Sequence, residues 1–204
     1  MSDMKLDEAA VRRPYRMRAR RVAAEATATG VLDAALHLFT DLPYEDVSLE
    51  LIAERSAVTK RTVLRRFGSK EELFSRAMAH GGEEEMRQRD AALVGDVDDA
   101  VRNVIAHYER WGNNRLRMIS QEHRIPVVRE SAEIGRRYHR AWVERTFAPL
   151  LLGRRGPSLE RRVIGLVALT DLYTWKLLRR DLGLSQAETE RTLIELIEAL
   201  KGES

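Results

Sequence analysis

The sequence contains no cysteine, few prolines and few aromatic residues. Of its 204 residues 5 are proline, and aromatic side chains make up 6%. The absence of cysteine excludes disulfides, thiolate metal sites and cysteine nucleophiles. The most apolar run, residues 163–170, falls far short of the roughly 20 residues that a membrane-spanning helix needs. The first twenty residues hold arginines with no apolar segment behind them, which is not the pattern of a secretory signal, so we predict a soluble, cytoplasmic protein with no membrane partner.

The signatures of enzymes are also missing. No histidine pair with the spacing of a metal site, no phosphate-binding loop and no nucleophile motif is found. The histidines are scattered over His37, His80, His107, His123 and His139. We therefore expect a protein that is not an enzyme, with no catalytic residue, no metal site and no cofactor. A helical enzyme remains the first competing interpretation.

Positive charge is concentrated near the N-terminus. The whole chain has a net charge of only +3, but residues 12–70 hold twelve lysines and arginines against seven acidic residues. The rest of the chain is therefore slightly acidic. Six of the arginines fall within residues 12–21. This distribution is typical of a protein whose N-terminal part meets a polyanion such as DNA.

Apolar residues recur at helical spacing almost everywhere, which predicts an all-α fold of about nine helices. We expect a flexible basic N-terminal arm over residues 1–17, a helix-turn-helix domain over 18–70, and a larger helical ligand-binding and dimerisation domain over 71–204. Capping residues and breakers give approximate helix limits. The expected helices cover residues 24–40, 49–56, 59–67, 69–93, 97–112, a short segment before Pro126, 127–152, 158–182 and a last helix that begins at the capping box Ser185–Glu188.

Two short helices joined by a tight turn, over residues 49–56 and 59–67, form the most informative feature. The second carries Lys60, Arg61, Arg65 and Arg66, with only Val63 and Phe67 as clear apolar contacts. A DNA-binding helix-turn-helix needs this arrangement, because its second helix lies in the major groove. Charge and spacing alone leave open that the basic residues form only a solvated helix face.

The detailed motif adds to this interpretation. Residues 47–73 read VSLELIAERSAVTKRTVLRRFGSKEEL. Over residues 31–78 the chain resembles the N-terminal module of the tetracycline-repressor (TetR) family of bacterial regulators. The shared features are an isoleucine-alanine pair, a valine, a capping Ser or Thr, a basic helix, an aromatic, a small residue and a Ser-Lys-Glu-Glu-Leu segment. In this sequence they are Ile52, Ala53, Val58, Thr59, Phe67, Gly68 and Ser69–Leu73. The other helices fit the family layout only in number and length.

The resemblance implies which residues contact DNA. Lys60 and Arg61, at the start of the recognition helix, are placed to donate to guanine O6 and N7, whereas Arg65 and Arg66 are better placed for phosphates. Thr62 falls at a contact position, and Lys70 falls where a lysine usually meets a phosphate. Ser48 and Thr59 are helix caps first and phosphate contacts second. The candidate DNA-binding residues are Ser48, Thr59, Lys60, Arg61, Thr62, Arg65, Arg66, Lys70, Arg18 and Arg20.

Three residues depart from the family pattern. Ala57 stands where glycine is usual in the turn, which predicts a strained backbone or a different turn. Leu64 replaces an aromatic midway along the recognition helix, so a hydroxyl-phosphate contact is missing. Glu50 stands where basic residues are common, and it could accept from cytosine or pair with Arg55 or Arg66. These departures put the operator sequence in doubt rather than the binding of DNA.

The arginines of residues 12–21 have two interpretations. They form either a solvated tail or an arm that follows the DNA backbone or enters the minor groove, as N-terminal arms of other helix-turn-helix proteins do.

A palindromic operator requires two recognition helices, so we expect a homodimer on double-stranded DNA with an inverted repeat. The resemblance places the dimer contact in the last two helices, where Val163, Val167, Leu178, Leu193, Ile197 and Leu200 are the apolar candidates. It also implies a repressor that a small molecule releases from its operator.

Aromatic residues at helical spacing suggest where an effector binds. The pairs Tyr108 and Trp111, and Tyr138 and Trp142, each share a helix face, and in the family such helices surround a ligand cavity. An apolar lining with polar groups such as Asn114 and Gln121 would suit a small apolar or aromatic effector. An aromatic core that binds nothing fits equally well. The candidate pocket residues are Tyr108, Trp111, Met118, His123, Tyr138, Trp142 and Trp175.

Two further interpretations stay open at this point. One is a helical partner-binding regulator that does not read a specific operator, and the other is a basic protein that binds DNA without sequence preference.

Overall fold

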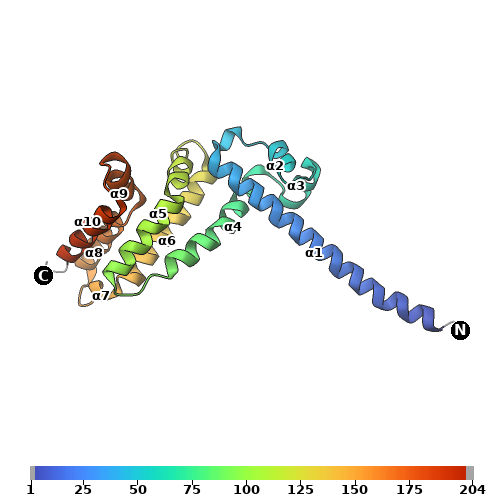
Figure 1. Ribbon diagram of the computed structural model, residues 1–204, viewed down its shortest axis with the longest axis horizontal. Helices are drawn as coiled ribbons and strands as arrows, with labels where there is room; N and C mark the ends of the chain where they lie inside the picture. Colours follow the sequence, from blue (N-terminus) through green and yellow to red (C-terminus); the bar gives the residue numbers. More distant parts are fainter. Residues whose placement is uncertain (1–2, 201–204) are drawn as a thin grey trace. The chain divides into compact units, whose positions relative to one another are not determined.

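The computed structural model describes residues 3–200, and within this range the side chains of all residues except 3–16, 19 and 20. Every regular element in the described part of the chain is helical, and no strand occurs there (Figure 1). The predicted all-α class is confirmed. None of the described helices is long and apolar enough to cross a membrane.

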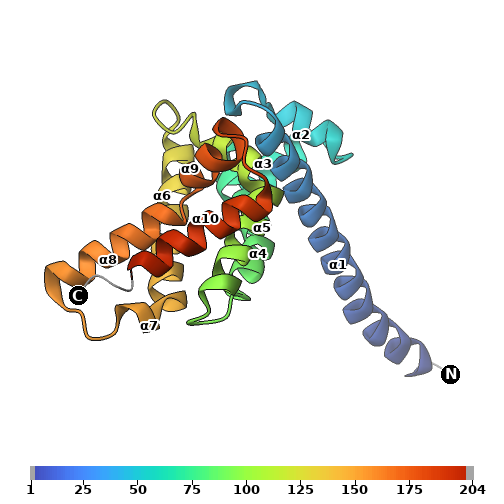
Figure 2. The same cartoon turned by 60° about the vertical axis from the view of Figure 1, so that its left-hand side comes forward.

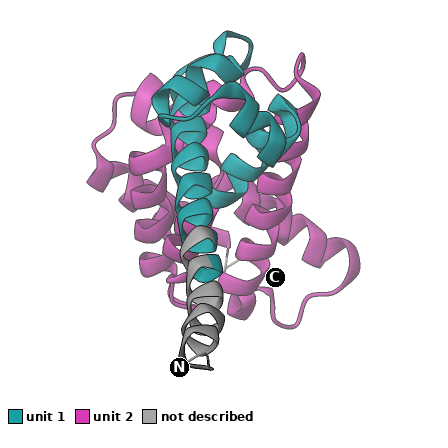
Figure 3. Ribbon diagram, turned by 90° about the vertical axis from the view of Figure 1, so that its right-hand side faces the viewer, with its two compact units in different colours: residues 1–80 teal, residues 81–204 magenta. Residues whose placement is uncertain are grey.

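The chain forms two compact units, residues 1–80 and 81–204 (Figure 3). The boundary lies inside one continuous helix, α4 (Lys70–Asp90). Two adjacent glycines at 81 and 82 lie in this helix without interrupting it. Each unit has its own apolar core, so we describe them separately.

Unit 1 is a small helical domain with an aromatic core. Its elements before α4 are α1 (Asp3–Asp41), η1 (Tyr44–Asp46), α2 (Leu49–Arg55) and α3 (Lys60–Phe67). Phe39 and Phe74 meet edge to face with ring centroids 5.0 Å apart, and Tyr44 contacts both rings. Val31, Ala35 and Phe39 share the buried face of α1, four residues apart along the helix.

The helix α1 begins at Asp3, about twenty residues before the predicted start near Ala24. Residues 17, 18 and 21–30 expose most of their side chains, so packing does not hold this part of the helix. Its alanines, arginines and glutamate have high intrinsic helix propensity, which explains why the helix does not end where its apolar stripe ends. Most of the residues expected to form a flexible arm, 1–17, have side chains outside the described part of the structure.

Unit 2 is a bundle that packs around α5. Beyond α4 its elements are α5 (Val97–Ile119), α6 (Pro126–Thr146), α7 (Ala148–Leu151), α8 (Gly156–Leu169), α9 (Leu172–Lys176), η2 (Leu177–Asp181) and α10 (Gln186–Ala199). The helices α8 and α10 lie side by side (Figure 2). The capping box predicted at Ser185–Glu188 is present at the start of α10.

Three helix limits in unit 2 differ from the prediction. The helix α5 does not end near Gly112 but continues through the two asparagines to Ile119. Gly112 instead allows a close approach, because a Cβ at this position would lie 2.7 Å from the Trp175 ring. The helices expected over residues 127–152 and 158–182 are each divided. One break precedes Pro149, which cannot donate a helical hydrogen bond, and the other is at Asp171, which caps α9 by accepting from Tyr173 N at 2.8 Å.

Candidate functional site

The two short helices of unit 1 begin at side-chain caps. The Ser48 hydroxyl accepts from the Leu51 backbone N–H at 3.1 Å, and the Thr59 hydroxyl accepts from Thr62 N at 3.2 Å. Thr59 Oγ1 also lies 3.0 Å from Thr62 Oγ1. Each cap satisfies a backbone donor that has no partner inside the helix. Both caps occur where the sequence predicts them, and they fix the starting points of α2 and α3.

The turn between α2 and α3 contains a backbone conformation that is unusual for its residue. Ala57 has a φ of 54°, and no other described residue apart from glycine has a positive φ. Val58 N donates to Ala53 O at 2.9 Å and Ala57 N donates to Glu54 O at 3.1 Å. These two bonds form a Schellman motif, in which the left-handed position is usually glycine. The strained turn that the sequence predicts at this alanine is therefore present.

The helix α3 has one buried side and one basic, exposed side. Val63 and Phe67 are 1% and 4% exposed, and Val58 in the preceding turn is partly buried. Arg61, Arg65 and Arg66 are exposed, and none forms an ion pair with any residue that the structure describes. The guanidinium groups of α3 are thus available for anions in solution.

Lys60 is paired inside the chain. Its Nζ donates to Glu50 Oε1 at 2.5 Å, so Glu50 pairs with Lys60 rather than with Arg55 or Arg66. The hydrogen bond from Lys60 holds the pKa of the Glu50 carboxyl below its usual value. Both side chains are largely exposed, so the pair competes with water and is weak.

Lys70 is held by unit 1 itself. Its Nζ donates to the Tyr44 carbonyl oxygen at 2.6 Å and lies 4.2 Å from the centre of the Tyr44 ring. Partial burial lowers its pKa, while Glu71 and other nearby carboxylates raise it. Lys70 therefore begins α4, and its ammonium group contacts Tyr44 of η1.

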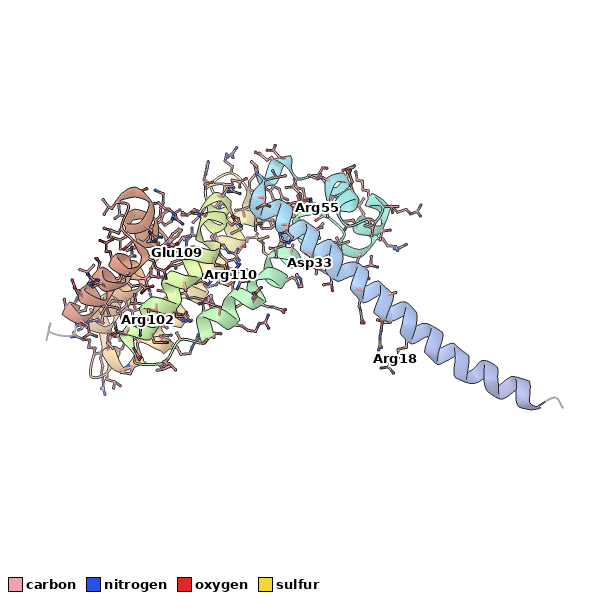
Figure 4. All side chains as sticks on the ribbon, viewed as in Figure 1. Arg18, Asp33, Arg55, Arg102, Glu109 and Arg110 are labelled. Carbon is pink, nitrogen blue, oxygen red and sulfur yellow. The ribbon has the colours of Figure 1, made fainter. Side chains whose placement is uncertain are left out.

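Two arginines of the N-terminal segment, Arg18 and Arg20, are predicted to contact DNA, and the structure describes the side chain of the first. Arg18 is exposed on α1, and its side chain projects away from the helix (Figure 4). The side chain of Arg20 lies outside the described residues.

The sequence of residues 31–77 matches the family model "Bacterial regulatory proteins, tetR family". This segment contains the caps, the turn and the basic helix described above. The chain carries the TetR-family domain. The resemblance noted from the motif of residues 47–73 is confirmed. No curated protein sequence matches the chain.

Solved structures of regulatory proteins share the fold of most of the chain. A TetR-family regulator from Streptomyces coelicolor superposes with a TM-score of 0.67 at 16% identity, over 86% of this chain and 80% of that one. A transcriptional regulator from Pseudomonas aeruginosa PAO1 gives 0.67 at 14%, over 87% and 91%. AibR, in complex with isovaleryl coenzyme A and operator DNA, gives 0.56 at 17%, over 84% and 97%. This chain therefore shares the fold of these transcriptional regulators.

The predicted pocket residues of unit 2 fall into separate groups. Trp142 and Trp175 are fully buried, and the Tyr108 and Trp175 ring centroids lie 5.9 Å apart. Trp111 is partly buried, with its ring centroid 4.9 Å from that of His107. The structure thus brings together tyrosine and tryptophan side chains from α5 and α9 in one core.

The remaining candidates lie elsewhere in unit 2. His123 is exposed in the segment between α5 and α6, and Met118 is buried outside the main core cluster. The Tyr138 hydroxyl donates to Asp90 Oδ1 at 2.8 Å, and partial burial together with this carboxylate raises the Tyr138 pKa to about 12. A surface groove of about 340 Å³ is lined by none of the seven candidates. Its walls are Arg140, Glu144, Ala148, Leu151, Leu152, Leu159, Glu160 and Val163.

The sequence analysis did not identify the buried polar residues of unit 2, and among them Arg89 of α4 is only 3% exposed. Its neighbours in sequence are charged, so the segment looks like a solvated face. The signal that could have found it is its helical spacing, because Arg89 lies four residues after the partly buried Glu85, on the same side of α4.

Proposed function

We propose that this protein is a sequence-specific, DNA-binding transcriptional regulator, and more narrowly a repressor that leaves a palindromic operator when a small effector binds. The single observation that carries the proposal is α3. It is anchored to unit 1 through Val63 and Phe67 and leaves three unpaired arginines facing solvent. A helix with this distribution can lie in a major groove without unfolding the domain that holds it.

The proposed roles follow the position of each residue on the helix. Arg61 lies in the first turn, where recognition helices reach base edges, and its planar fork fits guanine O6 and N7. Lys60 shares that turn and would leave Glu50 to reach a base or a phosphate. Arg65 and Arg66 lie in the last turn and would contact phosphates, which position the helix without reading sequence. We propose residues 18–70 as the DNA-reading part of the chain and residues 71–204 as the sensing and dimerising part.

A homodimer through α8 and α10 would supply the second recognition helix. Val163, Leu193 and Ile197, which the sequence analysis considered for this contact, are buried within their own chain. The exposed apolar residues of the same two helices are Ile164 and Leu196, at 53% and 45% exposure. We therefore propose that these residues, rather than the buried ones, contact the partner subunit.

The effector part of the proposal is supported by family precedent and by the polar interior of unit 2. The structure of AibR contains both isovaleryl coenzyme A and operator DNA, so one protein of this fold binds a small acyl compound and DNA. An effector releases DNA only if it favours a dimer geometry whose recognition helices no longer fit both half-sites. As a regulator bound to the chromosome, rather than an enzyme, the protein would act in the cytoplasm.

The proposal is tested by selection from random DNA. Purified full-length protein is incubated with a random-sequence pool at two salt concentrations, and bound molecules are sequenced after several rounds. The proposal predicts enrichment of an inverted repeat whose half-sites are about one helical turn, or a multiple of it, apart. Binding that collapses with salt for every sequence would indicate a nonspecific basic protein instead. No binding in either salt would favour the alternative of a helical regulator that acts through protein partners.

A further inference from the structure

A positively charged side chain is buried in unit 2 without an anionic partner. Arg89 on α4 is 3% exposed, and no carboxylate of a described residue lies within ion-pair distance of its guanidinium. Its Nε has no hydrogen-bond partner. An arginine cannot lose its proton at any ordinary pH, so it stays charged in the interior. Buried charges in proteins are paired or hydrogen-bonded because an isolated one is costly, and an unmatched buried group therefore needs an explanation.

Aromatic rings and a histidine surround this guanidinium. Arg89 Cζ lies 4.1 Å from the centre of the Trp142 ring and 5.5 Å from that of Tyr108. Its Nη2 donates to His139 Nδ1 at 2.9 Å. Cation–π contacts reduce the cost of burying the charge but bring no negative charge to it. The rings therefore form apolar walls beside an unneutralised cation.

The two nearby histidines do not change the charge of this region. An arginine only donates, so His139 Nδ1 must accept, and the His139 ring is then neutral. Burial, followed by the charge of Arg89, lowers the pKa of His139 to about 3. Its Nε2 lies 3.2 Å from Thr170 Oγ1, which donates onward to a backbone carbonyl. Burial likewise lowers the pKa of His107 to about 2.

The acidic residues near this region already have partners. Glu85 receives two hydrogen bonds from Arg115, at 2.5 and 3.1 Å, and lies 4.0 Å from His107. Asp171 caps the start of α9. Neither carboxylate forms an ion pair with Arg89, so the guanidinium has no anionic partner in direct contact.

We infer that Arg89 anchors a small organic carboxylate, whose apolar part packs against the Trp142 and Tyr108 rings. A carboxylate matches the planar fork of a guanidinium, and its single negative charge equals the single positive charge of Arg89, which a phosphate dianion would exceed. The ligand would enter as the rings move apart and would replace His139 as the partner of Nη2. The inference rests on the effector-sensing role proposed above and narrows the effector from apolar compounds in general to organic acids.

The test is thermal unfolding of the full-length protein with matched acids and amides. The probes are about 10 mM acetate, hexanoate and phenylacetate, with hexanamide and phenylacetamide as uncharged controls, at constant ionic strength. For a Kd near 1 mM, one or more of the acids raises Tm by about 3 to 6 °C, and its amide does not. No acid-specific rise with any of the acids, or equal rises for acid and amide, would overturn the inference.

Variants assign the effect to Arg89. Arg89→Met removes the charge with a side chain of similar length, and it should abolish the acid-specific rise. Arg102→Met removes an exposed arginine from α5 and should leave the rise unchanged (Figure 4). Should Arg89→Met not fold, Arg89→Lys keeps the charge but not the fork. It should weaken acid binding about tenfold or more in a titration of tryptophan fluorescence. An acid effect that survives both changes at Arg89 contradicts the assignment.

These measurements need no DNA, so the two proposals fail independently. An acid-specific rise without operator binding would overturn only the regulatory role. Operator binding without an acid-specific rise would overturn only the role of Arg89.

Discussion

The buried histidines of unit 2 predict a loss of stability in mild acid. His107 and His139 are 8% and 9% exposed, and burial lowers their pKa values to about 2 and 3 from an ordinary value of 6.5. A histidine whose pKa is depressed by folding has no effect on stability well above pH 6.5, and it destabilises the native state as the pH falls below 6.5. The reason is that the unfolded chain gains a proton on each ring while the native chain does not.

The size of this loss of stability follows from the difference in histidine protonation between the unfolded and the native chain. At pH 5.5 each histidine of the unfolded chain is protonated about ten to one, while both are neutral in the native chain. Protonation of the unfolded chain therefore lowers the free energy of unfolding by about 1.4 kcal/mol for each histidine at pH 5.5, and by close to zero at pH 7.5. The free energy of unfolding should therefore fall by about 3 kcal/mol between pH 7.5 and 5.5 from these two residues. Native pKa values a full unit higher would not change this result.

Urea unfolding followed by tryptophan fluorescence measures this loss of stability. The signal reports on unit 2, because all 3 tryptophans lie in residues 81–204. The comparison is between the wild type and His139→Gln, at one protein concentration and at both pH values. Glutamine offers an acceptor to Arg89 and a donor to Thr170 but does not titrate. The variant should lose about 1.4 kcal/mol less than the wild type between the two pH values.

Other titrating groups cancel in this difference, since they are present in both proteins. An equal pH dependence in the two proteins would show that His139 is not a neutral, buried ring, and the reasoning about its environment would then be wrong.

Three substitutions test other parts of the structure. Ala57→Gly should stabilise unit 1 by about 0.5 to 1 kcal/mol, measured by thermal unfolding, because the left-handed backbone costs alanine more than glycine loses in entropy; a loss of stability would contradict the strained turn. Gly112→Ala should cost about 1 to 3 kcal/mol in urea unfolding, although alanine favours helix, because its Cβ would meet the buried Trp175 ring. An unchanged free energy of unfolding for Gly112→Ala would mean that α5 and α9 separate easily. Glu50→Gln should raise affinity for the selected operator several-fold and steepen its salt dependence, because it removes the carboxylate charge that pairs with Lys60 beside the proposed DNA-reading helix; unchanged affinity would show that the pair plays no part in binding.

The segment from α2 to the end of α3 could be predicted from the sequence in detail, because local signals determine it. The hydroxyl caps at Ser48 and Thr59, the apolar positions Val63 and Phe67, and the glycine after α3 each act within a few residues. Even the strain at Ala57 could be inferred from one missing glycine.

Unit 2 was harder to predict because tertiary contacts decide its helix limits. Gly112 resembles a helix end in the sequence, but the approach of Trp175, more than sixty residues away, explains why a glycine lies within α5. The Lys60–Glu50 pair and the burial of Arg89 likewise depend on how helices pack. A local pattern cannot show whether a charged side chain points into a core.

The central claim is that the first turn of α3 reads DNA sequence, and one competition experiment tests it most directly. The measured quantity is the ratio of affinities for the selected inverted repeat and for a scrambled duplex of equal composition. It is compared for the wild type, Arg61→Ala and the control Arg102→Ala, which removes an arginine of unit 2. The account predicts that Arg61→Ala lowers the ratio by about five-fold or more, as expected for the loss of a base contact, while the control keeps it. A ratio that is the same in all three proteins, or close to one in the wild type, would contradict sequence reading by α3.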